Sequence, residues 1–207
     1  MRELISILQL ILIYSIPILF AITVHEVAHG WVANKLGDAT AKIMGRLTLN
    51  PLRHIDLVGT VLVPLLLVTL SGFIFGWAKP VPVTWSNLKH PRRDAALVAI
   101  AGPISNFMMA AMWAVILKVG GFFPAVVKMA EIGIYINLIL LVLNLVPIPP
   151  LDGSRVVSSL LPRRLANKYD SIGVFGFLIL LLLLVSGVLG NVLLPVVNFL
   201  RWMFLSF

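Results

Sequence analysis

Five long stretches of this sequence contain no charged side chain, and each could cross a membrane as a helix. They cover residues 4–24, 57–78, 95–117, 132–151 and 171–200. A membrane-spanning helix needs about 20 consecutive apolar residues. Hydrophobic residues make up 60% of the chain and charged residues 12%, whereas soluble domains average roughly half apolar and about a quarter charged residues. The sequence therefore predicts an all-α polytopic integral membrane protein.

Charge and cysteine content narrow the class of function further. The formal net charge is +8, and the lysines and arginines lie in short segments between the apolar runs. This is the positive-inside bias of membrane proteins, so we expect a lipid bilayer and no nucleic acid as a partner. The absence of cysteine from the sequence excludes disulfides and thiolate metal sites. No repeat or linker divides the chain, and we expect one membrane-embedded domain over residues 1–207.

The segment HEVAH, residues 25–29, follows directly on the first apolar run. On a helix, His25 and His29 are four residues apart and lie on one face, so their imidazoles can bind the same cation. The H-E-x-x-H pattern supplies two zinc ligands and a general base, here Glu26. The alternative is a histidine pair that hydrogen-bonds between helices. The cost of ionisable side chains in a membrane span favours the metal site.

A catalytic zinc ion usually takes three protein ligands, so a third ligand must come from elsewhere in the chain. The candidates are His54, Asp56, His90, Asp94, Glu131, Asp152 and Asp170. Asp152 differs from the others because three prolines within 147–150 break the apolar run before it, and Gly153 permits a tight turn. Irregular backbone at membrane depth is tolerated where it is buried or lines a cavity. The alternative role of Asp152 is a cap for a helix that starts near Ser154.

Three motifs together resemble the site-2 protease family of intramembrane zinc metalloproteases. They are HEVAH at 25–29, AGPISN at 101–106 and NLVPIPPLDG at 144–153, in the order that the family has. The section between the first two motifs resembles the small bacterial and archaeal branch, which lacks PDZ and CBS domains. The resemblance covers about 130 residues (25–153). It implies a multi-pass protein of a prokaryotic plasma membrane.

The resemblance also implies roles for individual residues. Zn²⁺ would be bound by His25, His29 and Asp152, with Glu26 as the catalytic base. Two asparagines would bind the substrate, namely Asn144 and Asn106. The alternative for Asn106 is a polar residue in a close helix contact that Gly102 permits.

The activity implied is that of a zinc-dependent endopeptidase, which hydrolyses peptide bonds within or near the transmembrane segments of membrane-protein substrates. Two alternatives are a membrane metal-binding or transport protein, and an inactive protease homologue that acts as a scaffold. A transporter would spread polar residues along a path, usually in repeated halves. In this sequence the polar motifs converge on one place.

The positions of the two ligand motifs constrain the topology. His25 and Asp152 both follow the apolar runs that carry them, so these two helices must run in the same direction to reach one metal ion. Parallel helices need an odd number of crossings between them, yet two apolar runs intervene. We predict that 57–78, which contains Pro64 and Gly72, forms a re-entrant hairpin. The last run, 171–200, exceeds one span, and we predict that SGVLGN at 186–191 turns it into a helical hairpin. This gives about five to six transmembrane helices.

The distribution of basic residues supports this topology. If 57–78 does not cross, the segments 34–94 and 152–170 share one side and carry twelve lysines and arginines. The positive-inside rule then places the N-terminus outside and the zinc site near the cytoplasmic face. The segments 42–50 and 77–85 are predicted to be extended and close to the site. One of them would pair with an unwound substrate by strand addition, or the two would form a structural hairpin that seals the cleft.

Overall fold

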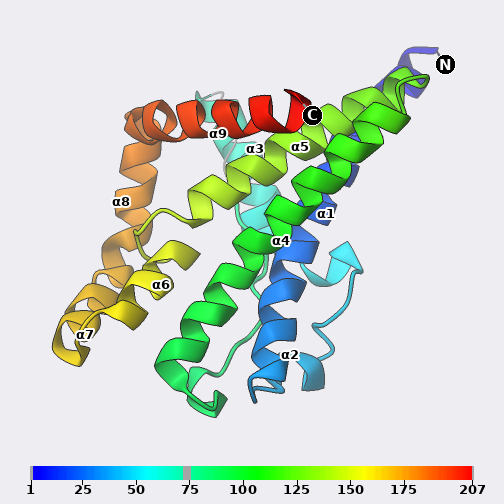
Figure 1. The fold of residues 1–207 in the computed structure, drawn as a ribbon. Coiled ribbons are helices and arrows are strands. Elements are labelled where there is room, and N and C mark those ends of the chain that lie inside the picture. The colour runs from blue at the N-terminus through cyan, green and yellow to red at the C-terminus, as the bar shows by residue number, and fades with distance from the viewer. Residues whose placement is uncertain (1, 72–75, 207) are drawn as a thin grey trace.

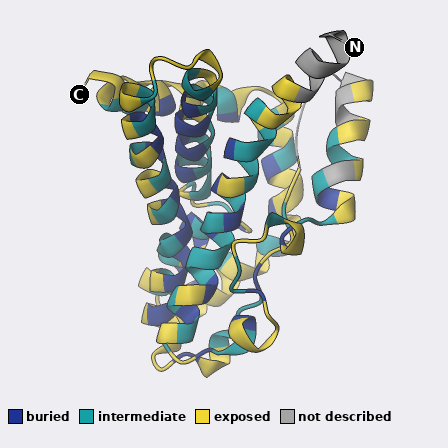
Figure 2. Ribbon diagram, turned by 90° about the vertical axis from the view of Figure 1, so that its right-hand side faces the viewer, coloured by how far each residue is buried: buried dark blue, intermediate teal, exposed yellow. Residues whose placement is uncertain are grey.

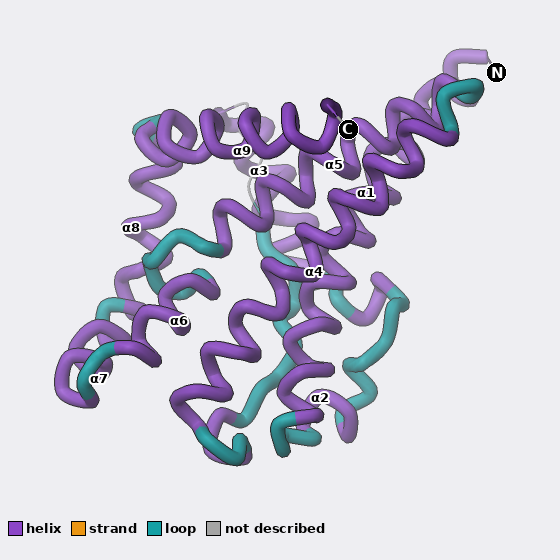
Figure 3. The backbone as a smooth tube through the Cα atoms, viewed as in Figure 1, coloured by secondary structure: helices purple, strands orange, loops and turns teal. Residues whose placement is uncertain are grey.

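The computed structural model of the protein describes residues 2–71 and 76–206, and its regular elements in that part of the chain are helical (Figures 1 and 3). Among the described residues, four helices are long and apolar enough to cross a membrane: α1 (Arg2–Lys35), α4 (Pro91–Val119), α5 (Pro124–Asn144) and α9 (Val188–Ser206). A fifth span results if the bent pair α7 (Arg163–Ser171) and α8 (Gly173–Val185) counts as one. The predicted all-α polytopic membrane protein is confirmed, with four or five candidate spans in the described residues where five to six were expected.

Shorter elements connect these helices. They are α2 (Thr40–Ile43), the 3₁₀ turn η1 (Pro51–Arg53), the π-helical η2 (Leu57–Leu62), α3 (Val63–Ser71), the 3₁₀ turn η3 (Trp85–Asn87) and α6 (Asp152–Leu160). Segment 77–84 has no regular element, as expected for an extended connection. Segment 42–50 differs from its prediction at its start, because α2 extends to Ile43 and the chain then turns at Gly45, where φ is +65°.

The ends of the long helices follow from local chemistry. Pro91 and Pro124 occupy the first turn of α4 and α5, where the missing N–H costs no intrahelical hydrogen bond. The carboxylate of Asp94 accepts the backbone N–H of His90 at 2.8 Å and so caps α4. Helix α5 ends at Asn144, ahead of the proline-rich segment 147–150 that cannot continue it.

Helices α1, α4 and α5 pack together and alternate in direction, so that α1 and α5 run the same way (Figure 1). This is the arrangement that the two ligand motifs require. A buried cluster between α4 and α5 includes Trp113, Ile134 and Leu138, and Val197 of α9 joins it. Gly133 permits the closest approach, since a Cβ at that position would collide with the indole of Trp113.

Apolar side chains also cover much of the outer surface. Figure 2 shows buried residues on the inner faces of the central helices and exposed residues on their outer faces. The exposed side chains include large hydrophobic groups such as Ile11, Met108, Val115 and Phe175. Contiguous exposed apolar surface of this kind marks a lipid-facing surface in a chain with several spans.

The two ends of segment 57–78 lie side by side, as a hairpin there requires. The backbone N–H of Trp77 donates to the carbonyl of Gly59 at 3.0 Å, and that of Lys79 donates to the carbonyl of His54 at 2.9 Å. The segment therefore returns to the place where it began. The tip of the predicted hairpin, including Gly72, lies outside the described residues.

The last apolar run is broken within 186–191, as predicted, but its two halves do not form the predicted helical hairpin (Figure 1). Gly187 has a φ of +75°, a conformation that glycine adopts without strain, and it separates α8 from α9. Helix α9 crosses α5, and Val197 of α9 is buried at that contact. Helices α8 and α9 meet at a wide angle (Figure 1).

Candidate metal centre

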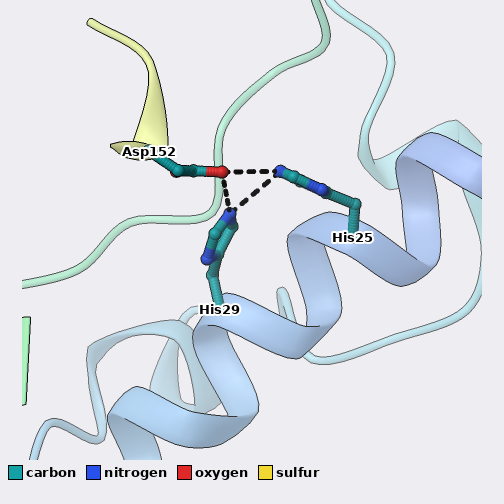
Figure 4. Close-up of side chains that lie close together, drawn as sticks. All are labelled: His25, His29 and Asp152. Atoms are coloured by element: carbon teal, nitrogen blue, oxygen red, sulfur yellow. Dashed lines mark hydrogen bonds and ion pairs between the residues drawn. The ribbon is translucent and has the colours of Figure 1, made fainter. Parts of the chain in front are cut away.

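Three side chains from two helices point toward one another (Figure 4). The Nε2 atoms of His25 and His29 lie 3.0 Å apart. Oδ2 of Asp152 lies 3.2 Å from Nε2 of His25 and 3.3 Å from Nε2 of His29. The histidines stand one turn apart on α1, and Asp152 is the first residue of α6. The structure thus brings the three predicted metal ligands together.

Two glycines allow this convergence. A Cβ at position 102 on α4 would lie 2.5 Å from Cε1 of His25 and 2.5 Å from Nε2 of His29, so only glycine lets α4 pass the two rings. A Cβ at Gly153 would collide with the backbone carbonyl of Leu145. Gly153 therefore lets the start of α6 lie against the end of α5, which aims Asp152 at the histidines. Oδ2 of Asp152, the atom aimed at the histidines, accepts no hydrogen bond from the described start of α6.

Hydrogen bonds at the far side of each imidazole fix its tautomer. Nδ1 of His25 lies 2.6 Å from Oδ1 of Asn106, and Nδ1 of His29 lies 2.7 Å from the carbonyl of Val98. Both partners are acceptors, which assigns the ring proton to Nδ1 in each case. Both Nε2 lone pairs then face the centre. Metal-binding histidines commonly have this outer hydrogen bond, which orients the ring and strengthens it as a ligand.

A second amide supports Asn106. Nδ2 of Asn106 donates to the carbonyl of Ala21 at 3.2 Å and to Oδ1 of Asn137 at 2.9 Å. Asn137 in turn donates to the carbonyl of Gly133 at 2.8 Å. Both asparagines are completely buried. Asn137 was not among the candidate residues named from the sequence. The signal that could have identified it is an amide side chain within an otherwise apolar run.

The donor set fits a zinc ion. Oδ2 of Asp152 is buried without a hydrogen-bond partner, and the two Nε2 lone pairs face it. Three electron-pair donors so close together repel one another unless a cation lies among them. A tetrahedral zinc site with bonds of about 2.0–2.1 Å separates its ligand atoms by about 3.3 Å. The observed separations of 3.0 to 3.3 Å agree with that geometry.

Comparison with known proteins decides the family. Residues 122–186 match the family model of Peptidase family M50. The chain is 38% identical over 192 residues to "Putative zinc metalloprotease YwhC" of Bacillus subtilis, a match that covers 88% of this chain and 84% of that protein. The chain belongs to peptidase family M50. It is a zinc metalloendopeptidase of the site-2 protease family, as the three sequence motifs indicated.

More distant relatives carry a similar name. The chain is 29% identical over 178 residues to "Putative zinc metalloprotease Rip2" of Mycolicibacterium smegmatis, covering 84% of this chain and 66% of that protein. It is 30% identical over 139 residues to the Rip2 of Mycobacterium tuberculosis, covering 65% of this chain and 52% of that protein. No solved structure matches the chain significantly.

The glutamate of this M50 peptidase's HEVAH motif has a backbone partner. Oε2 of Glu26 accepts the N–H of Val81 at 2.7 Å. Val81 lies within segment 77–85, which the sequence predicts to be extended and close to the site. The carboxylate is therefore held by a donor that no side-chain pattern reveals.

The other predicted substrate residue, Asn144, lies at the last position of α5. Its Nδ2 donates to the carbonyl of Leu140, one turn earlier on the same helix, at 3.0 Å. The structure thus places Asn144 at the end of the helix that leads to Asp152, and places Asn106 behind His25.

Five of the remaining ionisable candidates have partners for their side chains elsewhere in the fold. Asp56 caps η2 by accepting the N–H groups of Val58 and Gly59. His54 is buried, with Nε2 at 2.9 Å from the carbonyl of Thr48. The others pair as follows: Asp94 with the N–H of His90, Glu131 with Lys128, and Asp170 with Ser158.

Proposed function

We propose that this peptidase hydrolyses peptide bonds within or near the transmembrane segments of other membrane proteins. One observation carries the proposal: the histidine pair stands on a span-length apolar helix and meets its carboxylate partner inside the helical bundle. Ionisable side chains within a membrane-spanning helix cost free energy. A peptidase that acts on soluble substrates gains nothing from metal ligands in such a helix.

In this proposal His25, His29 and Asp152 hold the zinc ion. A zinc ion bound there supplies a Lewis acid and an activated water molecule. Glu26 accepts the proton of the attacking water through its carboxylate and passes that proton to the leaving amine. Asn106 and the carbonyl of Val98 keep the two imidazoles in the tautomer that binds metal.

We further propose that Asn144 contacts the substrate. Its side chain leaves the carbonyl of Leu140 and donates to the oxygen that becomes negative as water attacks the peptide bond. The position of Asn144 at the end of α5, on the segment that leads into Asp152, supports this role.

The substrate segment must unwind before its peptide bonds can be attacked, because a helix shields its own carbonyls. Unwound backbone in an apolar setting needs hydrogen-bond partners, and we propose that segment 42–50 or 77–85 supplies them by strand addition. The central part of 77–85 has few free donors, since Pro80 and Pro82 have no N–H and the N–H of Val81 is held by Glu26.

The charge distribution supports an active site near the cytoplasmic face of a plasma membrane. The side that carries the connections 36–56 and 79–90 also carries most of the lysines and arginines. Basic residues in short loops favour the cytoplasmic side.

The test is cleavage by the purified, zinc-loaded protein in lipid nanodiscs. The substrates are a panel of single-span proteins and an unfolded soluble protein, and the variants are Glu26→Gln and Asp152→Ala. We expect the wild type to cut the single-span substrates at sites mapped by mass spectrometry to the span or its edges. Glu26→Gln should keep its zinc and lose activity, whereas Asp152→Ala should lose both.

A matched control is Asp170→Asn, which changes an acidic residue away from the centre and should retain activity. Preferential cleavage of the soluble protein would contradict the proposed substrate class. Cleavage retained by Glu26→Gln would contradict the assignment of the base. Addition of a zinc chelator should abolish wild-type cleavage, and added Zn²⁺ should restore it.

A further inference from the structure

Segment 77–84, which we call the strap, lies across α1 at the HEVAH motif. A Cβ at Gly30 would lie 2.7 Å from Cγ1 of Val81 and 2.6 Å from Cδ2 of Leu47. The Val81 side chain is buried there. Gly30 lies one helical turn after Glu26 on α1. The absence of a side chain there lets the middle of the strap lie directly on this helix.

Both ends of the strap are anchored away from the metal centre. Near its start, the N–H of Lys79 donates to the carbonyl of His54 at 2.9 Å. At its end, the N–H of Thr84 donates to Asp38 at 2.8 Å. Between the anchors, prolines occupy positions 80 and 82, which leaves the N–H of Val81 as the donor that faces Glu26.

A buried arginine holds the opposite side of the same part of the strap. A terminal guanidinium nitrogen of Arg46 lies 2.9 Å from the carbonyl oxygen of Lys79 and 3.4 Å from that of Pro80. Only 8% of Arg46 is exposed, and its Nε has no hydrogen-bond partner. Among the described residues no carboxylate forms an ion pair with it. Burying a cation without a carboxylate partner costs folding free energy. We therefore ask what Arg46 contributes by contacting these carbonyls.

The carbonyl of Pro80 and the N–H of Val81 belong to one peptide group. That group is planar, and in the trans form its C=O and N–H point in opposite directions. The guanidinium of Arg46 lies 3.4 Å from that oxygen, and its shorter contact of 2.9 Å is with the carbonyl of Lys79 one residue earlier. The Glu26 carboxylate accepts the N–H. A cation at the oxygen also polarises the peptide and strengthens its N–H as a donor. The orientation of Glu26 is thereby linked to Arg46 through a single rigid unit.

We propose that Arg46 is a positioning residue of this peptidase, which acts through the Pro80–Val81 peptide group to hold the carboxylate of Glu26 in its working orientation. The inference rests on the proposed role of Glu26 as the base. Arg46 does not touch the metal ligands in this arrangement. Its loss should therefore change the rate of the chemical step and leave zinc binding intact.

The test is a double-mutant cycle on cleavage kinetics. Arg46→Gln removes the cation, Val81→Pro removes the N–H, and a third variant carries both changes. We expect each single change to lower kcat by about 10- to 100-fold, the cost of a misplaced catalytic group, with KM and zinc content close to wild type. The double variant should be no slower than Val81→Pro alone, because both changes break one linkage.

Controls separate this linkage from general damage. Arg53→Gln changes an exposed arginine from the same connection and should keep kcat within about twofold. Arg46→Lys, which retains a cation and donors, should recover part of the lost kcat. Multiplying effects in the double variant, or an unchanged kcat in Arg46→Gln, would overturn the proposal.

Hydrogen exchange gives a readout that does not need a substrate. The amide of Val81, followed by mass spectrometry of peptides that span the strap, should exchange slowly in the wild type and in Arg53→Gln. It should exchange at least about tenfold faster in Arg46→Gln, because the strap loses one of its holds. Equal exchange in Arg46→Gln and wild type would overturn the role of Arg46. If the wild type cleaves none of the substrates, the proposed function fails, and the exchange measurement still decides whether Arg46 holds the strap.

Discussion

The side-chain oxygen of Asn106 lies 2.6 Å from Nδ1 of His25, at a completely buried position. This pairing joins α4 to α1 and presents the Nε2 lone pair of His25 to the metal centre. The chain from His25 through Asn106 to Asn137 crosses three helices. The ligand geometry therefore depends on the packing of the bundle as much as on the HEVAH motif.

Replacement of Asn106 by alanine should weaken zinc binding. The N–H of His25 would lose its acceptor, and the loss of such an outer partner typically costs about 10- to 100-fold in metal affinity. Zinc affinity can be measured by competition with a coloured chelator. Asn198→Ala, at an exposed position on α9, is the matched control and should bind zinc like the wild type. Unaltered affinity in Asn106→Ala would show that the bundle orients His25 without this hydrogen bond.

A methyl group at position 102 should destroy the metal centre. In Gly102→Ala the new Cβ would lie 2.5 Å from atoms of both imidazoles, so the rings or α4 must move. We expect the purified variant to contain little zinc, as measured by elemental analysis, and to lose cleavage activity.

Gly190→Ala provides the matched control for that substitution. Gly190 lies within α9 with nothing near its would-be Cβ. The change should keep the zinc and stabilise the helix slightly, by up to about 1 kcal/mol. A full zinc complement in Gly102→Ala would mean that the rings can yield without loss of the site.

The features that the sequence could predict are those with a local pattern. The spacing of His25 and His29 places them on one face of a helix, whatever residues surround them. The proline-rich segment ahead of Asp152 predicts that the helix ends there. Long apolar runs identify spans by length alone.

The partners of these residues could not be predicted, because they depend on which helix faces meet. Glu26 and His29 each use a backbone group, that of Val81 and Val98, and a backbone group has no sequence signature. Arg46 is one of many basic residues in the connections, and its burial against the strap appears only in the fold. Segment 42–50 was expected to be extended, but α2 extends into it as far as Ile43.

Acid should destabilise the protein through Asp38. Burial acts to raise the pKa of this carboxyl, but hydrogen bonds from Thr40, the N–H of Thr84 and Asn87 outweigh it and hold the pKa below the ordinary value of 3.8. The ionised form therefore stabilises the fold above that pH. This contribution is lost as the pH falls below 3.8 and through the lower folded-state pKa.

The unfolding temperature in detergent should accordingly fall as the pH drops below about 4. Asp38→Asn should lower stability at neutral pH by about 1–3 kcal/mol, the cost of a disrupted buried hydrogen-bond group, and its difference from the wild type should shrink in acid. Glu131→Gln, which breaks a half-exposed pair with Lys128, should change stability by less than about 1 kcal/mol. A pH-independent difference between Asp38→Asn and wild type would exclude Asp38 as the titrating group.

Site-directed labelling should place the base of the 57–78 hairpin on one side of the membrane. The chain contains no cysteine, so Met44→Cys, Ser86→Cys and Phe122→Cys each carry a single thiol at an exposed position. The first two flank the hairpin, and α4 separates the second from the third. A membrane-impermeant maleimide applied to intact cells should label position 122 alone. Positions 44 and 86 should react only after the membrane is opened.

The three positions separate the alternatives for topology. If 57–78 crossed the membrane, positions 44 and 86 would label from opposite sides. The carbonyl–amide pairs between 54–59 and 77–79 would then have to break, because they join the two ends of that segment. If α4 did not cross, positions 86 and 122 would label from the same side, and the parallel arrangement of α1 and α5 that brings Asp152 to His25 and His29 could not form in a membrane. Labelling of 44 and 86 from the cytoplasm, with 122 outside, is the one pattern that satisfies both the hydrogen bonds at the hairpin base and the positive-inside rule.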